Sequence, residues 1–317
     1  MKNFSKADKQ LALAVKVSRM YYNDKLSQVE ISKTLNISRP TISRLLQLAL
    51  ERGIVTITIH DPFSNLDTLD KQLAEKYKLK KVLIGNQVEE SYEKILEEIG
   101  KLGANYLTSI VKDNDIIGMS WGKTVATLSR YLKDDLHQNI KTVCLKGTVA
   151  NSTHSNYSNL ISQNFNRAFH TQTQLLPVPL IFESKKMRDT ILEDHIINQI
   201  MEEGIKSQIA IFTVGTTRSN AMLFDLGYFN KNTIQHLQKD SVGDIISQFI
   251  DKKGNLVDSN LEDRTMAMHI DYLKNKRDSI LIAGGKAKIE PMHAALVGGY
   301  ANTLITDLNS AQELLKM

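Results

Sequence analysis

Residues 27–52 contain two short helical patterns separated by a tight turn, and no other feature limits the fold of this part of the chain as strongly. Apolar residues recur at helical spacing in both segments, and Ser38 with Pro40 suits the N-terminus of the second helix. Such a helix enters a major groove by its N-terminal half, where polar side chains can bond base edges and phosphates. The segment therefore predicts a helix-turn-helix that binds double-stranded DNA, with an ordinary helical hairpin as the alternative. The polar residues expected on the DNA-binding face are Arg39, Thr41, Ser43, Arg44 and Gln47.

Positive charge is concentrated in the same region. Residues 1–62 hold ten Lys or Arg against five Asp or Glu, and this surplus of five equals the net charge of the whole chain. Phosphate contacts supply most of the sequence-independent affinity of proteins for nucleic acid. A basic segment that coincides with a helix-turn-helix pattern therefore favours operator DNA as a partner.

Length and composition exclude several classes of protein. A chain of 317 residues predicts at least two domains. It contains no run of about 18 apolar residues and begins with no signal-peptide pattern, so we expect no membrane partner and a cytoplasmic location. Cys144 is the single cysteine, which excludes an intrachain disulfide or a cysteine-based zinc site. The eight histidines form no metal-type cluster, so we expect neither a metal nor a cofactor.

Asp61–Pro62 marks the expected domain boundary, because it interrupts an alternating apolar pattern over residues 54–60. That pattern predicts a strand, a wing beside the helix-turn-helix. We therefore predict an all-α (winged) helix-turn-helix DNA-binding domain over residues 1–62, whose first helix covers 7–22. Residues 63–317 would form a domain for effector binding and oligomerisation.

A linking helix is expected over residues 64–78, where leucines recur at spacings of three and four. It could pack against its own subunit or against the same helix of a second subunit.

Short apolar runs alternate with helical segments from residue 81 onward, which predicts an α/β domain with a doubly wound, mostly parallel sheet. In such sheets ligands bind at the carboxyl ends of the strands. Strands are expected at 81–84, 115–118, 141–145, 175–178, 209–214, 280–283 and 303–305. Helices are expected near 89–111, 122–133, 159–169, 187–203, 233–237, 263–275 and 287–298.

Three glycine-containing loops that follow predicted strands carry groups suited to an anion. GMSWGKT at 118–124 has two glycines, a lysine and a threonine before a helix. VGTTRSN at 214–220 adds an arginine, and AGGKAK at 283–288 adds two lysines. Together they predict a phosphorylated small molecule. A hydrolase nucleophile elbow at 118–122 and simple turns are the alternatives.

A fourth loop begins with Lys146, directly after an apolar strand. Apolar surroundings disfavour a charged amine, and a neutral amine can form a Schiff base with an aldehyde. A solvated lysine is the alternative, and without further context it is the favoured one. Asp244 and Asp251 fall in loop segments at 242–245 and 249–254, where a carboxylate could bind sugar hydroxyls or lie on a surface turn.

Over roughly residues 8–315 the chain resembles the SorC family of sugar-sensing bacterial transcriptional regulators. The resemblance rests on SRPTISRLL, GMSWGKT, VGTTRSN, VGDI with FIDKKG, and AGGKAKIEPMHAALVGGYANTLITD. It implies an effector domain similar to sugar-phosphate isomerases and deaminases that regulates rather than catalyses, in dimers or tetramers on palindromic operators. It also implies phosphate binding by Lys288, which matches the family's basic position after Gly-Gly and two further residues, and leaves Lys286 open.

Lys146 resembles the lysine of the deoxyribonucleoside regulator branch, which forms a Schiff base with deoxyribose 5-phosphate. The resemblance implies a repressor of deoxyribonucleoside or sugar catabolism genes that a phosphosugar releases from its operator. The alternatives are another phosphosugar pathway, an activator, and, less favoured, an isomerase or aldolase-type enzyme. The expected effector-binding residues are Ser120, Gly122, Lys123, Thr124, Lys146, Gly147, Gly215, Thr216, Thr217, Arg218, Asp244, Gly285 and Lys288.

Overall fold

The computed structural model describes residues 6–55, 66–85, 91–148 and 157–317. The chain divides into two compact units, Met1–Phe63 and Ser64–Met317. The assignment of the first unit to DNA binding and of the second to effector binding and oligomerisation stays a prediction.

The N-terminal unit is helical. Its elements are α1 (Lys6–Ser18), the π-helical turn η1 (Arg19–Asn23), α2 (Gln28–Leu35) and α3 (Arg39–Glu51). Ser27 and Glu30 form a capping box at the start of α2, and α2 ends at Asn36, whose φ is +52°. Ser38 precedes α3 as expected, but its hydroxyl bonds the Thr41 hydroxyl at 2.8 Å instead of capping a backbone N–H.

A small core holds these helices together. Its buried members recur at helical spacing and come from all three α-helices: Ala14, Val17, Ile31, Ile42, Leu45, Leu46 and Ala49. The predicted wing strand over residues 54–60 and the predicted boundary at Asp61–Pro62 lie almost wholly outside the described residues. Ile54 and Val55, which are described, pack against this core without forming a strand.

The second unit is built on a six-stranded sheet in the order β1-β8-β7-β4-β2-β3, and every strand pair in it is parallel. The mostly parallel sheet expected from the sequence is confirmed. Its strands are β1 (Lys81–Ile84), β2 (Ile116–Met119), β3 (Lys141–Cys144), β4 (Ile209–Phe212), β7 (Asp278–Ile282) and β8 (Thr303–Thr306). A separate antiparallel pair consists of β5 (Gly243–Ile245) and β6 (Gln248–Ile250).

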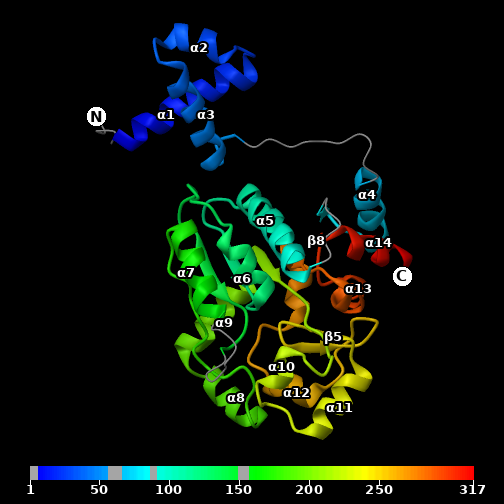
Figure 1. Ribbon diagram of the computed structural model, residues 1–317. Coiled ribbons are helices and arrows are strands. Elements are labelled where there is room, and N and C mark those ends of the chain that lie inside the picture. The colour runs from blue at the N-terminus through cyan, green and yellow to red at the C-terminus, as the bar shows by residue number, and fades with distance from the viewer. Residues whose placement is uncertain (1–5, 56–65, 86–90, 149–156) are drawn as a thin grey trace. The chain divides into compact units, whose positions relative to one another are not determined.

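Helices cover both faces of this sheet (Figure 1). The helices of this unit are α4 (Leu66–Tyr77), α5 (Tyr92–Ile110), α6 (Lys123–Arg130), α7 (Tyr157–Phe169), α8 (Lys185–Leu192), α9 (His195–Lys206), α10 (Met222–Asp225), α11 (Lys231–Asp240), α12 (Ser259–Arg264), α13 (Ile289–Val297) and α14 (Leu308–Lys316), with the short 3-10 helices η2 (Ile270–Asn275) and η3 (Lys286–Lys288).

Alternate residues of the strands belong to two different cores. Ile209 and Ile211 of β4 pack with α5, α6 and α7, whereas Ala210 and Phe212 pack with α4, α13 and α14. Because both faces are buried, the strands are continuous apolar runs in the sequence. Helix α4 packs against its own unit, since Leu73 is fully buried there and the Tyr77 hydroxyl donates to the Leu314 carbonyl at 2.8 Å.

The structure corrects several predicted elements. Residues 175–178 form no strand of the sheet; isolated parallel bridges from Gln174 to Val143 and from Pro179 to Thr148 flank them instead. The helix predicted over 263–275 is instead α12 and η2, because residues between them form bridges to Lys146 and Ile181. The helix predicted over 187–203 is two helices, and the loop predicted at 242–245 is strand β5.

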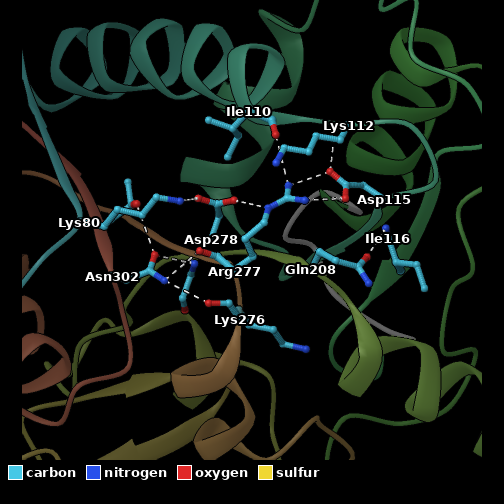
Figure 2. Close-up of polar contacts among 12 residues, drawn as sticks. Lys80, Ile110, Lys112, Asp115, Ile116, Gln208, Lys276, Arg277, Asp278 and Asn302 are labelled. Atoms are coloured by element: carbon cyan, nitrogen blue, oxygen red, sulfur yellow. Dashed lines mark hydrogen bonds and ion pairs between the residues drawn. The ribbon is translucent and has the colours of Figure 1, made fainter.

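Charged residues gather at the amino ends of the strands, the edge opposite to their carboxyl ends (Figure 2). The guanidinium of Arg277 makes a bidentate pair with Asp115 at 2.7 and 2.8 Å and a further bond to Asp278 at 2.8 Å. Lys80 bonds the second oxygen of Asp278 at 2.6 Å. Asp115 is 4% exposed and Asp278 is 1% exposed, so these pairs join the starts of β1, β2 and β7 in a largely buried network.

Candidate functional site

A cavity of about 400 Å³ lies at the carboxyl ends of the strands, where the predicted loops converge. Segments after β2, β3, β4 and β7 and one strand of the antiparallel pair contribute to its wall. Ten of the thirteen residues predicted to bind an effector line this cavity: Ser120, Gly122, Lys123, Thr124, Lys146, Gly215, Thr216, Arg218, Asp244 and Lys288.

The other three predicted residues have structural contacts outside the cavity wall. The Gly147 carbonyl accepts a hydrogen bond from Nε1 of Trp121 at 2.8 Å. The Thr217 hydroxyl donates to the Ser241 carbonyl, and the Gly285 N–H donates to the Asp307 carboxylate at 2.8 Å. These three residues position the loops that carry the others.

The cavity also contains residues that sequence reasoning missed. Trp121 could have been found, because it is the single tryptophan and lies inside the glycine-rich loop. Val214 and Asn220 lie in the loop at 214–220 and Ala287 in the loop at 283–288, so these three could have been found as well. The others carry no local signal, since they reach the cavity only through the arrangement of the helices and loops. The additional lining residues are Tyr92, Trp121, Tyr157, Thr213, Val214, Asn220, Ala221, Met222, Leu223, Ile246 and Ala287.

One side of the cavity suits an anion. Gly122 is the N-cap of α6 and has a φ of +151°, a conformation that residues with a side chain rarely adopt. The start of α6 therefore presents backbone N–H groups and the positive end of the helix dipole to the cavity. Lys123 lies at this position, bonded to Glu93 at 3.1 Å and 5.4 Å from the centre of the Tyr92 ring.

Lys146 lies inside the cavity wall rather than in solvent. It is 5% exposed, its Nζ donates to the Ser247 hydroxyl at 3.0 Å, and Nζ lies 3.9 Å from the centre of the Trp121 ring. Burial lowers the pKa of Lys146 to about 8, although the nearby Asp244 carboxylate opposes this change. Of the two interpretations open from the sequence, a solvated lysine is excluded.

Asp244 and Lys288 complete a largely buried charged cluster around Lys146. Burial raises the pKa of Asp244, and the two lysines oppose this rise. Burial also lowers the pKa of Lys288, whose Nζ donates to the Val214 carbonyl. A Cβ atom at Gly215 would lie 1.6 Å from Oδ1 of Asp244, so only glycine at position 215 leaves room for this carboxylate.

Two buried hydroxyls in the cavity have no hydrogen-bond partner among the described residues, namely Oγ of Ser120 and Oγ1 of Thr213. Buried polar atoms are nearly always hydrogen-bonded, so a polar ligand in the cavity would satisfy them. Among the described residues no group of three or more His, Cys, Asp or Glu could hold a metal ion. Within the same residues, no helix is long and apolar enough to cross a membrane.

The residues predicted to contact DNA share one exposed face of α3. Arg39, Thr41, Ser43, Arg44 and Gln47 are all exposed, whereas Ile42, Leu45, Leu46 and Ala49 on the opposite face are buried. Gln47 bonds Glu51 at 3.0 Å. The polar face expected from the sequence is therefore available to a partner.

Residues 61–316 match the Sugar-bind family of sugar-binding domains. The deoxyribonucleoside regulator of Bacillus subtilis is 41% identical over 303 residues, which cover 96% of this chain and 97% of that relative. The chain belongs to this family of SorC-type transcriptional regulators. The recognition of the family from the sequence is confirmed.

Other relatives are similar to this chain over almost its whole length. The sorbitol operon regulator of Klebsiella pneumoniae is 29% identical over 96% of this chain and 98% of that relative. The crystal structure of full-length SorC from the same organism matches with a TM-score of 0.73 and 28% identity, over 97% of this chain and 99% of that chain. These relatives are transcriptional regulators and not enzymes, which is the class that the sequence indicated.

Proposed function

We propose that this regulator is a cytoplasmic repressor of deoxyribonucleoside or sugar catabolism genes, and that a phosphosugar such as deoxyribose 5-phosphate releases it from its operator. One observation carries the proposal: a buried lysine whose pKa is lowered to about 8 lines the same cavity as the start of α6 and the cations Lys123, Arg218 and Lys288. An aldehyde group suits the buried amine, and a phosphate at the other end of the same molecule suits the helix start and the cations. The similarity to a deoxyribonucleoside regulator supports this choice of sugar.

The phosphate would lie among Gly122, Lys123, Thr124, Arg218 and Lys288. Backbone N–H groups at a helix start bind phosphate without any net charge of their own, and the cations add Coulomb attraction. Lys123 and Arg218 are the exposed cations of this set, and Lys123 already pairs with Glu93. Arg218 would therefore be the cation that closes over the bound phosphate.

Replacing Arg218 by alanine should weaken binding of deoxyribose 5-phosphate by about 10- to 100-fold, because a hydrogen bond to a charged group contributes about 1.5–3 kcal/mol. Binding of unphosphorylated deoxyribose should not change. Titration calorimetry with both sugars measures the two effects. Arg130→Ala is the matched control, since it removes the same charge from the last turn of α6, outside the cavity. Equal binding of the two sugars to the unaltered protein would contradict a phosphate site.

The aldehyde would be captured by Lys146 as an imine. With a pKa of about 8, a far larger fraction of this amine is neutral near physiological pH than of an ordinary lysine, whose pKa is about 10.4. The phosphate groups hold one end of the sugar, which raises the effective concentration of the aldehyde at the amine.

Borohydride treatment with deoxyribose 5-phosphate should add one reduced sugar to the peptide that contains Lys146, and Lys146→Ala should abolish the adduct. Peptide mass spectrometry makes the measurement. Lys276 is an internal control, because burial lowers its pKa to about 8 as well, but its Nζ donates to the Gly204 carbonyl and it does not line the cavity. Labelling of Lys276 to the same extent would mean that a low pKa, not a binding site, selects the amine.

Regulation requires that the effector bind two states of the protein with different affinity. Operator affinity should therefore fall when deoxyribose 5-phosphate is added, and it should fall much less in Lys146→Ala.

We propose a homodimer or homotetramer on a palindromic operator, and sedimentation with and without effector would measure this oligomeric state. An activator would bind the same ligands and differ in the position of its operator, so a reporter assay separates the two. Turnover of the sugar would favour an aldolase-type enzyme instead.

A further inference from the structure

The turn between β5 and β6 has an unfavourable backbone at the wall of the cavity. Ile246 and Ser247 have φ values of +50° and +66°, the combination of a two-residue hairpin turn that normally contains asparagine and glycine. A β-branched residue rarely adopts this conformation. Both residues are almost completely buried, so packing and hydrogen bonds enforce it. Such strain is typical of functional positions.

Ser247 links two groups of the charged cluster through this turn. Its backbone N–H donates to Oδ2 of Asp244 at 3.0 Å, and its hydroxyl accepts from Nζ of Lys146 at 3.0 Å. Because both residues of the turn are in the left-handed region, Ser247 can bind the Asp244 carboxylate through its backbone and the Lys146 amine through its side chain. Gly215 packs against the other oxygen of Asp244, as described above.

The titratable groups around Asp244 come from three directions. Lys146 follows β3, Lys288 belongs to η3, and Cys144 lies beside Lys146, while Lys123 and Arg218 are charged residues at the rim. Burial raises the pKa of Asp244 and lowers those of both lysines, so protons are shared within a coupled group. Both directions favour the neutral forms, a protonated carboxyl group at Asp244 and a neutral amine at Lys146.

We propose that Asp244 is the acid–base residue of imine formation at Lys146, a role that rests on the covalent binding proposed above. The lone pair of the neutral amine attacks the aldehyde carbon, and a proton moves from nitrogen to the former carbonyl oxygen to give a carbinolamine. The protonated carboxyl group of Asp244 then donates its proton to the carbinolamine hydroxyl. The C–O bond breaks with release of water, and the nitrogen lone pair forms the C=N bond.

The products of this step are an iminium cation, a carboxylate and one water molecule. Amine, aldehyde and carboxylic acid are neutral at the start, and the two charges at the end are opposite and lie in the same buried cluster. The buried site therefore gains an ion pair and no net charge, which avoids the penalty of an unpaired buried charge. The Asp244 carboxylate also stabilises the adduct after it has formed, and this favours slow effector release.

The test compares the rate of imine formation in the unaltered protein and in Asp244→Asn. Fluorescence of Trp121, the single tryptophan, reports the reaction in real time because Nζ of Lys146 lies 3.9 Å from its ring centre. Borohydride trapping confirms the adduct. We expect the asparagine variant to react about 100-fold more slowly, within the usual contribution of a general acid. Asp251→Asn is the control, since Asp251 is a carboxylate just after β6 that does not line the cavity.

The pH profile separates this role from a structural one. The unaltered protein should react fastest at an intermediate pH, because the amine is protonated at low pH and the carboxyl group is deprotonated at high pH. In Asp244→Asn the rate of imine formation should no longer fall at high pH. If that variant does not fold, Asp244→Glu can be tested instead. Its rate of imine formation should still fall at high pH, because a carboxyl group remains at position 244. An unchanged rate and profile in Asp244→Asn, or loss of the decline in Asp244→Glu, overturns the proposal.

A comparison of two aldehydes tests the acid–base role of Asp244 separately from the identity of the effector. Deoxyribose 5-phosphate is the first, and pyridoxal 5′-phosphate, a phosphorylated aldehyde whose imine is coloured, is the second. If only pyridoxal phosphate reacts at Lys146 and the rate depends on Asp244, the role of Asp244 stands and the proposed effector is wrong. If neither aldehyde reacts at Lys146, both proposals are overturned.

Discussion

Replacing Arg277 by alanine should lower the free energy of unfolding by about 3–5 kcal/mol, the usual effect of removing one partner from a buried ion pair. The variant would leave Asp115 without its bidentate partner and Asp278 with Lys80 alone. Both aspartates are at most 4% exposed, so their carboxylates would lose charged hydrogen bonds at a largely buried place. Urea unfolding followed by circular dichroism measures the change. Lys185→Ala is the control, because its pair with Asp263 is exposed and should contribute less than about 1 kcal/mol.

The effect of Arg277→Ala should also depend on pH. Burial alone would raise the pKa of Asp278, but hydrogen bonds from Arg277 and Lys80 outweigh it and hold the pKa below the ordinary value of 3.8. A lowered folded-state pKa adds stability above the unfolded value, and this stability is lost as the pH falls through the folded value. The difference between the two proteins should therefore be largest near neutral pH and become smaller below about pH 4. A constant difference over this range would contradict the assigned role of the pair.

Replacing Arg39 and Arg44 together by alanine should reduce operator affinity by about 30-fold or more, because each contact to a base contributes about 1–3 kcal/mol and the two together about 2–6 kcal/mol. Both side chains lie on the exposed face of α3, so their removal should not disturb the core of Ile42 and Leu45. Fluorescence anisotropy with a labelled operator measures the affinity. Unchanged affinity in the double variant would remove these residues from the DNA interface.

Salt dependence separates the two ways in which these arginines could bind DNA. If an arginine binds a phosphate, its removal should lower the slope of log affinity against log salt concentration by about one. If it binds a base, its removal should relax sequence preference instead. Lys239→Ala is the control, because Lys239 lies in the last turn of α11, in the second unit of the chain. It should alter neither the slope nor the preference.

Local patterns were enough to predict most of the elements and most of the candidate site. The apolar spacing of Ile31 and Ile42, the glycine loops after strands and the fully apolar strands are all properties of short segments, and short segments determine helix, turn and strand. Parallel strands bring their carboxyl ends to one edge, so residues such as Lys123 and Lys288 could be expected to meet although 165 positions separate them.

The class of this protein, its basic N-terminal segment and the position of Lys146 at a strand end could all be read from the amino-acid order. The surroundings of that lysine are visible only in the folded chain: the Trp121 ring, the Ser247 hydroxyl and the Asp244 carboxylate, which lies on a hairpin where the sequence pattern predicts a loop. Folding also brings Asp115 into contact with Arg277, two residues far apart in the chain. Burial and pairing depend on strand order and side-chain packing, which no local pattern encodes.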